Sequence, residues 1–533
     1  MKSIMDKVYP KDILGIKKIG VERWLNDYYI PVTGEDFNMI CKNAYNSYFQ
    51  TLENYNDEVV RWIAVANMNI NNSIAWYILE VIRLAKLKEG GYGYLASNEV
   101  EKIPDDILDY KFPSVINNLN VIDRAMSNLS FKERIKNVFS TIKHNIYPAF
   151  IGQNFITNIS KPSFQIGYRH QKEMTAFCEN NNISPIHLAP LLFANKGFQN
   201  YENDDLFYKI VGFVDRFLTS LKGEYLTIDN KAFEILRSKL EECFTYSLMF
   251  FQQNINCLRR LKPKQLLVSG LGYPVHRLFC ASWRYLGGEV IGFVHGNNYC
   301  YGYVPGIVKY LLLVSQYVTI SSGHSKLLKK ASEDFSHGLK MGDVTYTNQG
   351  YYYQMFEKMQ KSNSTVQRIK KIMIVGFPMT NFYYYNLPGN FAFAQLDYEL
   401  RIMNILKSNG YYIIYKPHPR TSNEVEGVFN GYVDEVIEER FEEAYDTADC
   451  IVFGSFATST FGYTLLTNKP IVLFNVAGNY WYPKAFELIK RRCTVVEAKT
   501  VDGRVVFDEK DVLHAVQESI NNINYDILYE FAF

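Results

Sequence analysis

The stretch DCIVFGSFATSTFGYTLLTNKPIVLFN, residues 449–475, contains a complete strand–helix–strand unit and decides the fold class of the chain. Its first apolar run, DCIVFGS (449–455), ends in glycine and serine, as a buried strand leading into a turn does. A helical pattern follows in TSTFGYTLLTNK (458–469), and PIVLFN (470–475) is a second short apolar run. This order predicts a right-handed crossover between two parallel strands.

The same alternation continues through residues 370–533, where four further apolar runs are predicted as strands. They are KIMIVGFP (371–378), YYIIYKPHP (411–419), YVDEVIE (432–438) and CTVVEA (493–498). Helical patterns connect the strands, and DVLHAVQESINNI is the last of them. Six strands connected in this way predict a Rossmann-like domain.

A second alternating region lies upstream. QLLVSG (265–270), EVIGFVHG (289–296) and YVTISSG (317–323) are predicted as strands of another parallel sheet, with helices among them. Helical patterns dominate before about residue 260. The polar stretch QMFEKMQKSNSTVQR (354–368) is the predicted linker between the two alternating regions.

These patterns predict an α/β protein with three regions. They are a helical accessory region at residues 1–104, an N-terminal Rossmann-like domain at 105–353 and a C-terminal Rossmann-like domain at 370–533. Open parallel sheets bind their ligands beyond the carboxyl ends of the strands, so we expect a site in the cleft between the two sheets.

The composition indicates an ordered globular chain. Of 533 residues, 47% are apolar and 21% are charged, and the net charge of +2 predicts no nucleic-acid partner. Eight cysteines without a CxxC motif favour a reducing, cytoplasmic location and argue against structural zinc. No uninterrupted apolar window approaches 18 residues, so no membrane-spanning helix is expected.

The first candidate site is KPHPR (416–420), which ends a predicted strand. Its two prolines cannot extend a sheet ladder, and they hold His418 between them in extended geometry. Lys416 and Arg420 flank the histidine, so the local field is positive and suits a phosphate oxygen. The alternative interpretation is a rigid surface turn with an incidental histidine.

The second candidate is GSFATSTFG (454–462), which follows one strand of the opening unit and begins its helix. The segment supplies Gly454 and the four hydroxyls of Ser455, Thr458, Ser459 and Thr460. A helix N-terminus offers free N–H groups and the positive end of a dipole to a phosphate. Ordinary N-capping by one or two of the hydroxyls is the alternative.

Two histidines in the upstream region stand at the ends of predicted elements. His295 in FVHGNN ends a predicted strand and precedes a glycine, which suits a general base that faces the other domain. A loop histidine without a chemical role is the alternative. His324 stands at a predicted helix start, where capping by Ser322 or Ser325 suffices to explain the motif.

No motif predicts a metal site or a hydrolase triad. The sequence has no DxD, GxSxG or HExxH, and the acidic pairs at 105–106 and 204–205 are typical of helix caps or solvated charges. We therefore expect no metal.

Taken in order, VHG, KPHP and the hydroxyl cluster followed by NKPIVLFN resemble a superfamily of bacterial surface-polysaccharide transferases. It includes CDP-glycerol glycerophosphotransferases, capsule Kdo transferases and bacterial polysialyltransferases, and the resemblance spans about residues 260–500. It implies the GT-B arrangement of two facing Rossmann-like domains, here with an additional N-terminal helical region. It also implies that the nucleotide-activated donor is a substrate and that no cofactor is needed.

The resemblance also implies roles for the candidate residues. His418, with Lys416, Arg420 and the hydroxyl cluster, would contact the phosphate of a CMP or CDP leaving group. His295 would be the base that deprotonates the acceptor hydroxyl. The chain departs from the glycerophosphotransferases after VHG, where 297–300 read NNYC, and before Ser455, where they usually carry an acidic residue.

The expected function is a metal-independent glycosyltransferase of capsule or lipopolysaccharide type, with a CMP-linked sugar as the first expectation for the donor. The alternatives are a CDP-glycerol glycerophosphotransferase, a non-catalytic nucleotide-sugar binding protein and a sugar-nucleotide epimerase. The expected acceptor is a glycan or a lipid-linked glycan at the inner face of the membrane. LRRLKPK (258–264) and HSKLLKK (324–330) suit peripheral contact with anionic lipid, and solvated helix faces are the alternative for both.

Overall fold

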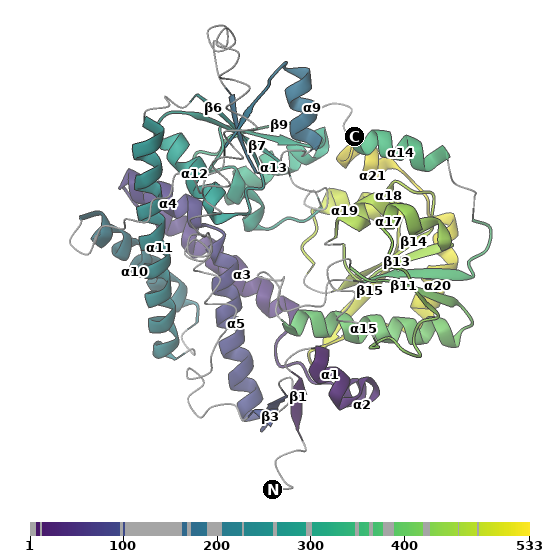
Figure 1. The fold of residues 1–533 in the computed structure, drawn as a ribbon. Coiled ribbons are helices and arrows are strands. Elements are labelled where there is room, and N and C mark those ends of the chain that lie inside the picture. The colour runs from purple at the N-terminus through teal and green to yellow at the C-terminus, as the bar shows by residue number, and fades with distance from the viewer. Residues whose placement is uncertain are drawn as a thin grey trace, which may run out of the picture.

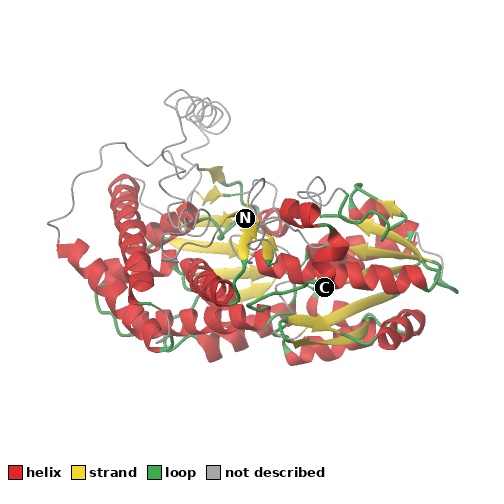
Figure 2. Cartoon of the chain, turned by 90° about the horizontal axis from the view of Figure 1, so that it is seen from below, coloured by secondary structure: helices red, strands yellow, loops and turns green. Residues whose placement is uncertain are grey.

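The computed structural model shows an α/β architecture with two large sheets that are parallel in all but one strand pair (Figure 1). The described residues are 7–10, 13–95, 100–101, 163–167, 172–188, 205–225, 229–259, 264–294, 301–346, 351–361, 366–376, 389–418, 427–456, 458–476 and 479–533. The predicted α/β class is confirmed, and Figure 2 shows both sheets flanked by helices.

The sheet nearer the C-terminus has seven strands in the order β12-β11-β10-β13-β14-β15-β16. They are β10 (Lys371–Val375), β11 (Tyr412–Lys416), β12 (Glu435–Val436), β13 (Cys450–Phe453), β14 (Ile471–Val476), β15 (Thr494–Val501) and β16 (Arg504–Val506). All six predicted strands are present, and β16, which pairs antiparallel with β15, was missed. Numbered along the chain, the parallel strands run 3-2-1-4-5-6, the order of doubly wound dinucleotide-binding folds.

Helices cover both sides of this sheet. They are α15 (Gly389–Ser408), α17 (Phe441–Ala444), α18 (Ser459–Leu465), α19 (Pro483–Arg492), α20 (Glu509–Glu518) and α21 (Asp526–Phe531), with short 3-10 turns η8 (Tyr445–Thr447) and η9 (Ser519–Asn521). Figure 1 shows α15 on one side of the sheet and α18 and α19 on the other. The stretch predicted as a linker is partly helical, because α14 (Tyr351–Lys361) extends into it.

The other sheet has six parallel strands in the order β5-β4-β6-β7-β8-β9. They are β4 (Ser163–Ile166), β5 (Ile186–His187), β6 (Gln265–Ser269), β7 (Glu289–Phe293), β8 (Gln316–Thr319) and β9 (Asp343–Tyr346). Its main helices are α9 (Lys172–Asn180), α12 (Pro274–Tyr285) and α13 (Ser322–Phe335), with the 3-10 helix η7 (Pro305–Tyr310) before β8. The three predicted strands are β6, β7 and β8; β4 and β5 lie in a region where helices were predicted to dominate.

Helices dominate the described part of residues 1–104, and a small sheet joins the ends of this segment. The elements are β1 (Val8–Pro10), α1 (Ile13–Ile19), α2 (Val21–Asn26), α3 (Gly34–Glu53), α4 (Glu58–Asn67), α5 (Ile70–Glu89), β2 (Gly93–Leu95) and β3 (Val100–Glu101). Figure 1 places α3, α4 and α5 beside α10 (Asp205–Gly223) and α11 (Asn230–Leu258), whereas α1 and α2 lie under the seven-stranded sheet, near α15. The region boundaries at 104 and 353–370 stay predictions.

A buried arginine joins α4 to the six-stranded half of the molecule. Arg277 on α12 is fully buried, and its guanidinium donates to the carbonyls of Ala66 (2.6 Å) and Val65 (2.7 Å). These carbonyls belong to the last turn of α4, where helical N–H donors run out, and Val65 O accepts one further bond there, from Met68 N at 3.4 Å. The N-terminal helices are therefore part of the same packed core and not an appendage.

Several contacts tie the halves together. An antiparallel bridge pairs Gly302 with Trp481, and Tyr482 N donates to Tyr301 O at 2.8 Å. Elsewhere α21 packs on α13 so closely that a Cβ on Gly323 would lie 1.8 Å from the carbonyl oxygen of Glu530. In the described part of the chain, no helix is long and apolar enough to cross a membrane.

Candidate functional site

The predicted phosphate-binding residues follow two strands that flank β10. Val375, at the end of β10, pairs with Lys416 on one side and with Phe453 on the other. Because neighbouring strands lie about 4.8 Å apart, these two flanking positions are separated by about 10 Å. The structure thus brings the KPHP and GSF segments to one carboxyl edge of one sheet.

Lys416 is the buried cation of this edge. Only 4% of it is exposed, and its ammonium donates to the carbonyl of Pro417 (3.2 Å). Among the described residues no carboxylate lies within ion-pair distance of it. Burial lowers the pKa of Lys416, and the more distant carboxylates Glu439 and Glu438 act in the opposite direction. A buried ammonium without a close counter-ion is suited to an anionic ligand.

His418 lies two residues beyond β11 and is half-buried, behind the buried Pro417. It therefore stands at the same edge as Lys416, as the sequence predicted. Arg420, the second cation of KPHPR, lies outside the described residues.

Packing accounts for Gly454. The hydroxyl of Tyr398 donates to the carbonyl of Gly454 at 2.6 Å, and an added Cβ would lie 2.4 Å from Nε2 of Gln395. Glycine is needed here because α15 approaches the turn closely, so a phosphate is not required to explain it. The next residue, Ser455, is buried at the wall of a small cavity of about 50 Å³.

The place of Ser455 in the topology is informative. It follows β13, and the strand order reverses between β10 and β13. This reversal is the topological switch point, where open α/β sheets bind their ligands.

The remaining hydroxyls divide into two kinds. Thr458 is the N-cap of α18, and its side chain accepts from Thr460 N at 3.3 Å, so the capping interpretation holds for this residue. Ser459 is exposed, and Thr460 is half-buried at the first turn. α18 has only seven residues, which limits any contribution of its dipole.

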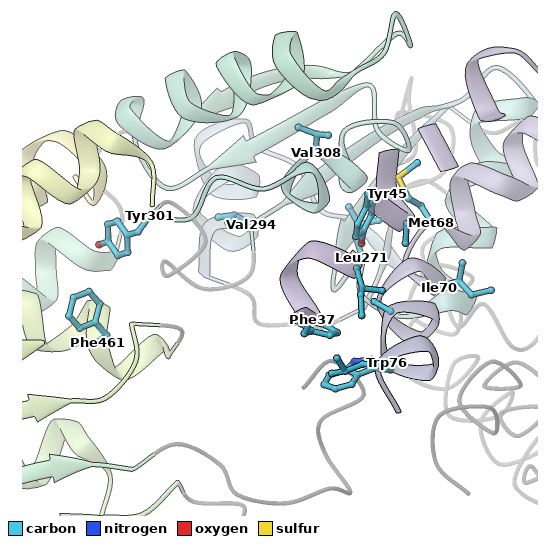
Figure 3. Packing of buried hydrophobic residues seen from close by; sticks show 14 of the residues in the cluster. Phe37, Tyr45, Met68, Ile70, Trp76, Leu271, Val294, Tyr301, Val308 and Phe461 are labelled. Carbon is cyan, nitrogen blue, oxygen red and sulfur yellow. The ribbon is translucent and has the colours of Figure 1, made fainter. Parts of the chain in front are cut away.

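A larger cavity of about 450 Å³ lies between the two halves. Its walls come mainly from α3, the end of β7, the segment 302–310 and α13, with Phe456 and Tyr480 from the C-terminal half. Figure 3 labels Tyr45 and Val294, which line this cavity from two of these elements, and shows Tyr301 beside Phe461 where the halves meet. Val294 lines the cavity, and His295, the predicted base, lies outside the described residues.

The large cavity and the small cavity at Ser455 are neighbours. Asn38 on α3 lines both, and Phe456, which lines the large one, directly follows Ser455. The carboxyl edges of the two sheets therefore border two neighbouring cavities. The volume of the larger cavity is within the range of small-molecule sites.

The interpretation of His324 needs correction. The N-cap of α13 is Ser321, whose hydroxyl accepts from His324 N at 3.1 Å, and neither Ser322 nor Ser325. His324 itself is 1% exposed and lines the large cavity. Burial lowers the pKa of its imidazole to about 3. Sequence reasoning also missed the contribution of α3, because no motif marks a helix that becomes a cavity wall only through packing.

Comparisons with protein-family models and with curated proteins find no match for the chain.

Proposed function

We propose that the protein is a metal-independent transferase with the GT-B arrangement, which transfers a sugar from a nucleotide-activated donor to a hydroxyl of a glycan or lipid-linked acceptor. One observation carries the proposal. Ser455 stands at the switch point of a 3-2-1-4-5-6 sheet, Lys416 and His418 share its edge, and a cavity walled by both halves adjoins it.

The edge of the seven-stranded sheet suits the leaving phosphate. As the acceptor oxygen bonds to the anomeric carbon, the bond from that carbon to the phosphate oxygen breaks, and the nucleotide departs with the electron pair. Lys416, His418 and Ser455 would stabilise the added negative charge there. Close packing explains Gly454 and helix capping explains Thr458, so both support the site without contacting the phosphate. Ser459, Thr460 and Arg420 stay in the proposal as predicted phosphate contacts.

The proton of the acceptor hydroxyl needs a base, and His295 is the residue proposed for it. It follows Val294, which lines the large cavity. The cytidine nucleotide and the cell-envelope acceptor rest on the sequence resemblance, as does peripheral contact with the inner face of a membrane.

A thermal-shift series with CMP, CDP, UDP, GDP and ADP tests the donor half of this proposal. A ligand at 100 times its Kd stabilises the folded state by about 2.7 kcal/mol, so a bound nucleotide raises the unfolding midpoint. A shift with cytidine nucleotides alone supports the cytidine donor. A shift with UDP alone removes the cytidine assignment, and the absence of any shift contradicts the proposed function.

CDP-glycerol should be compared with a CMP-linked sugar as donor in the presence of cell-envelope acceptors. Consumption of CDP-glycerol alone would assign the glycerophosphotransferase alternative. Nucleotide binding without consumption of any donor would favour the non-catalytic alternative.

A further inference from the structure

The described walls of the large cavity are rich in aromatic residues and carry positive but no negative charge. Seven of its twenty described lining residues are Tyr or Phe, two are lysines, and none is Asp or Glu. Aromatic walls suit an apolar ring face, and an excess of positive charge favours an anion. Asp334, which bonds the hydroxyl of the wall residue Tyr303, is already paired with Lys330 at 2.7 Å.

His324 is a buried hydrogen-bonding group without a partner. It lines the cavity, and neither ring nitrogen has a hydrogen-bond partner among the described residues. Because burial holds its pKa near 3, the imidazole is neutral at physiological pH and offers one donor and one acceptor. An unsatisfied buried polar group destabilises the folded protein, and a ligand hydroxyl bonded to His324 would remove that cost.

Tyr45 and Lys309 form a second polar position on the wall. The hydroxyl of Tyr45 is buried and has no partner in the described chain. Burial raises the pKa of this hydroxyl to about 12, and Lys309 is the cation that most lowers it. Lys309 also lies 5.2 Å from the ring centroid of Tyr310. The ammonium is therefore beside the cavity and not directed away into solvent.

We infer that this cavity binds a saccharide that carries a carboxylate or phosphate, with a hydroxyl on His324 and the anionic group at Lys309 and Tyr45. A saccharide presents apolar C–H faces to aromatic rings and hydroxyls to isolated polar groups. An acyl chain would leave the polar atoms of His324 and Tyr45 unsatisfied. The inference rests on the proposed function, because it names the chemical class of the acceptor.

Calorimetric titration of the full-length protein tests this inference. The probes are 3′-sialyllactose for a carboxylate and glucose 6-phosphate for a phosphate, with lactose and glucose as their neutral counterparts. We expect one charged probe to bind at least tenfold more tightly than its neutral counterpart, since a charge-assisted hydrogen bond contributes about 1.5–3 kcal/mol. The charged probe that binds identifies the anion.

Two variants separate the polar positions. Lys309→Gln should abolish the preference for the charged probe, whereas Lys326→Gln, an exposed lysine on the helix of His324, should keep it. His324→Phe should weaken the bound probe about tenfold while the protein stays folded, because it removes two nitrogens that have no protein partner.

The inference is overturned if neither charged probe binds better than its neutral counterpart, or if Lys309→Gln leaves the preference intact. If no charged saccharide binds but a nucleotide still raises the unfolding midpoint, only this inference is removed. Saccharide binding without any nucleotide shift keeps the cavity as an anionic saccharide site and contradicts the transferase.

Discussion

The backbone amide of Tyr303 donates a hydrogen bond of 3.0 Å to the carbonyl of Tyr480, and both residues line the large cavity. Tyr303 belongs to the half with the six-stranded sheet and Tyr480 to the half with the seven-stranded sheet. The wall of the cavity is therefore made by main chain that joins the two halves. Any widening of the cleft at this point breaks the bridge between Gly302 and Trp481.

The second junction gives a direct stability prediction. Gly323→Ala would place a Cβ 1.8 Å from the carbonyl oxygen of Glu530, so α13 and α21 must separate. We expect a loss of about 1–3 kcal/mol in unfolding free energy, as for other overpacked sites, measured by urea denaturation. Gly223→Ala is the matched control, because nothing lies within 4 Å of its added Cβ and alanine favours the helix. Equal stability of the two variants would contradict the observed junction.

Arg277 provides a test of how the N-terminal helices are held. Arg277→Met keeps much of the side-chain volume but leaves the carbonyls of Val65 and Ala66 buried and without their guanidinium donor. We expect a loss of about 3 kcal/mol in urea denaturation. Arg216→Met, which removes an exposed arginine beside the Tyr55 ring, should cost less than about 1 kcal/mol.

The strands with continuous apolar runs could be predicted from sequence, and the weaker ones could not. QLLVS and CIVF are buried over nearly their whole length, so their patterns are unambiguous. β4 has only four residues, half of them partly exposed, and β16 is a three-residue hairpin partner of β15. Such short strands are formed by their neighbours in the sheet and carry little signal of their own.

The candidate site was predictable only where it follows a strand. Lys416, His418 and Ser455 lie at the expected edge because carboxyl ends of parallel strands coincide. Gly454 was wrongly read as a sign of phosphate binding. Glycine is required at this position because Tyr398 and Gln395, on a helix about 55 residues earlier, leave no room for a side chain. The cavity wall on α3 depends on packing between distant segments, which no local pattern encodes.

Lys416 should contribute to binding and not to stability. Its pKa is lowered by burial, so folding disfavours the charged ammonium and the charge reduces stability at neutral pH. Lys416→Met should therefore leave unfolding free energy unchanged or raised, while it weakens nucleotide binding about tenfold in the thermal-shift series.

The control for this variant is Lys407→Met, which removes a surface ion pair with Asp434 at 3.0 Å. It should cost at most about 1 kcal/mol and leave nucleotide affinity intact. A Lys416→Met protein that binds nucleotide as well as the parent would remove Lys416 from the proposed clamp.

Because His324 is buried, we expect the unfolding free energy of the protein to fall at acidic pH. The pKa of the buried imidazole is about 3 in the folded protein, against about 6.5 in an unfolded chain. Between these values the unfolded state binds a proton that the folded state does not, so stability falls as pH falls below about 6.5. At pH 5 the loss from this residue is about 2 kcal/mol.

His324→Phe should remove this part of the acid sensitivity, because phenylalanine does not titrate. Urea denaturation at pH 7 and pH 5 measures it: the parent should lose about 2 kcal/mol more between these pH values than the variant does. His514→Gln, on the exposed side of α20, controls for the removal of a histidine and should behave as the parent. If His324→Phe and the parent lose equal stability on acidification, the imidazole is not held neutral in the folded state. The cavity would then have room for a charged imidazole and the water that solvates it, and the hydrogen bond assigned to a saccharide hydroxyl would lose its physical basis.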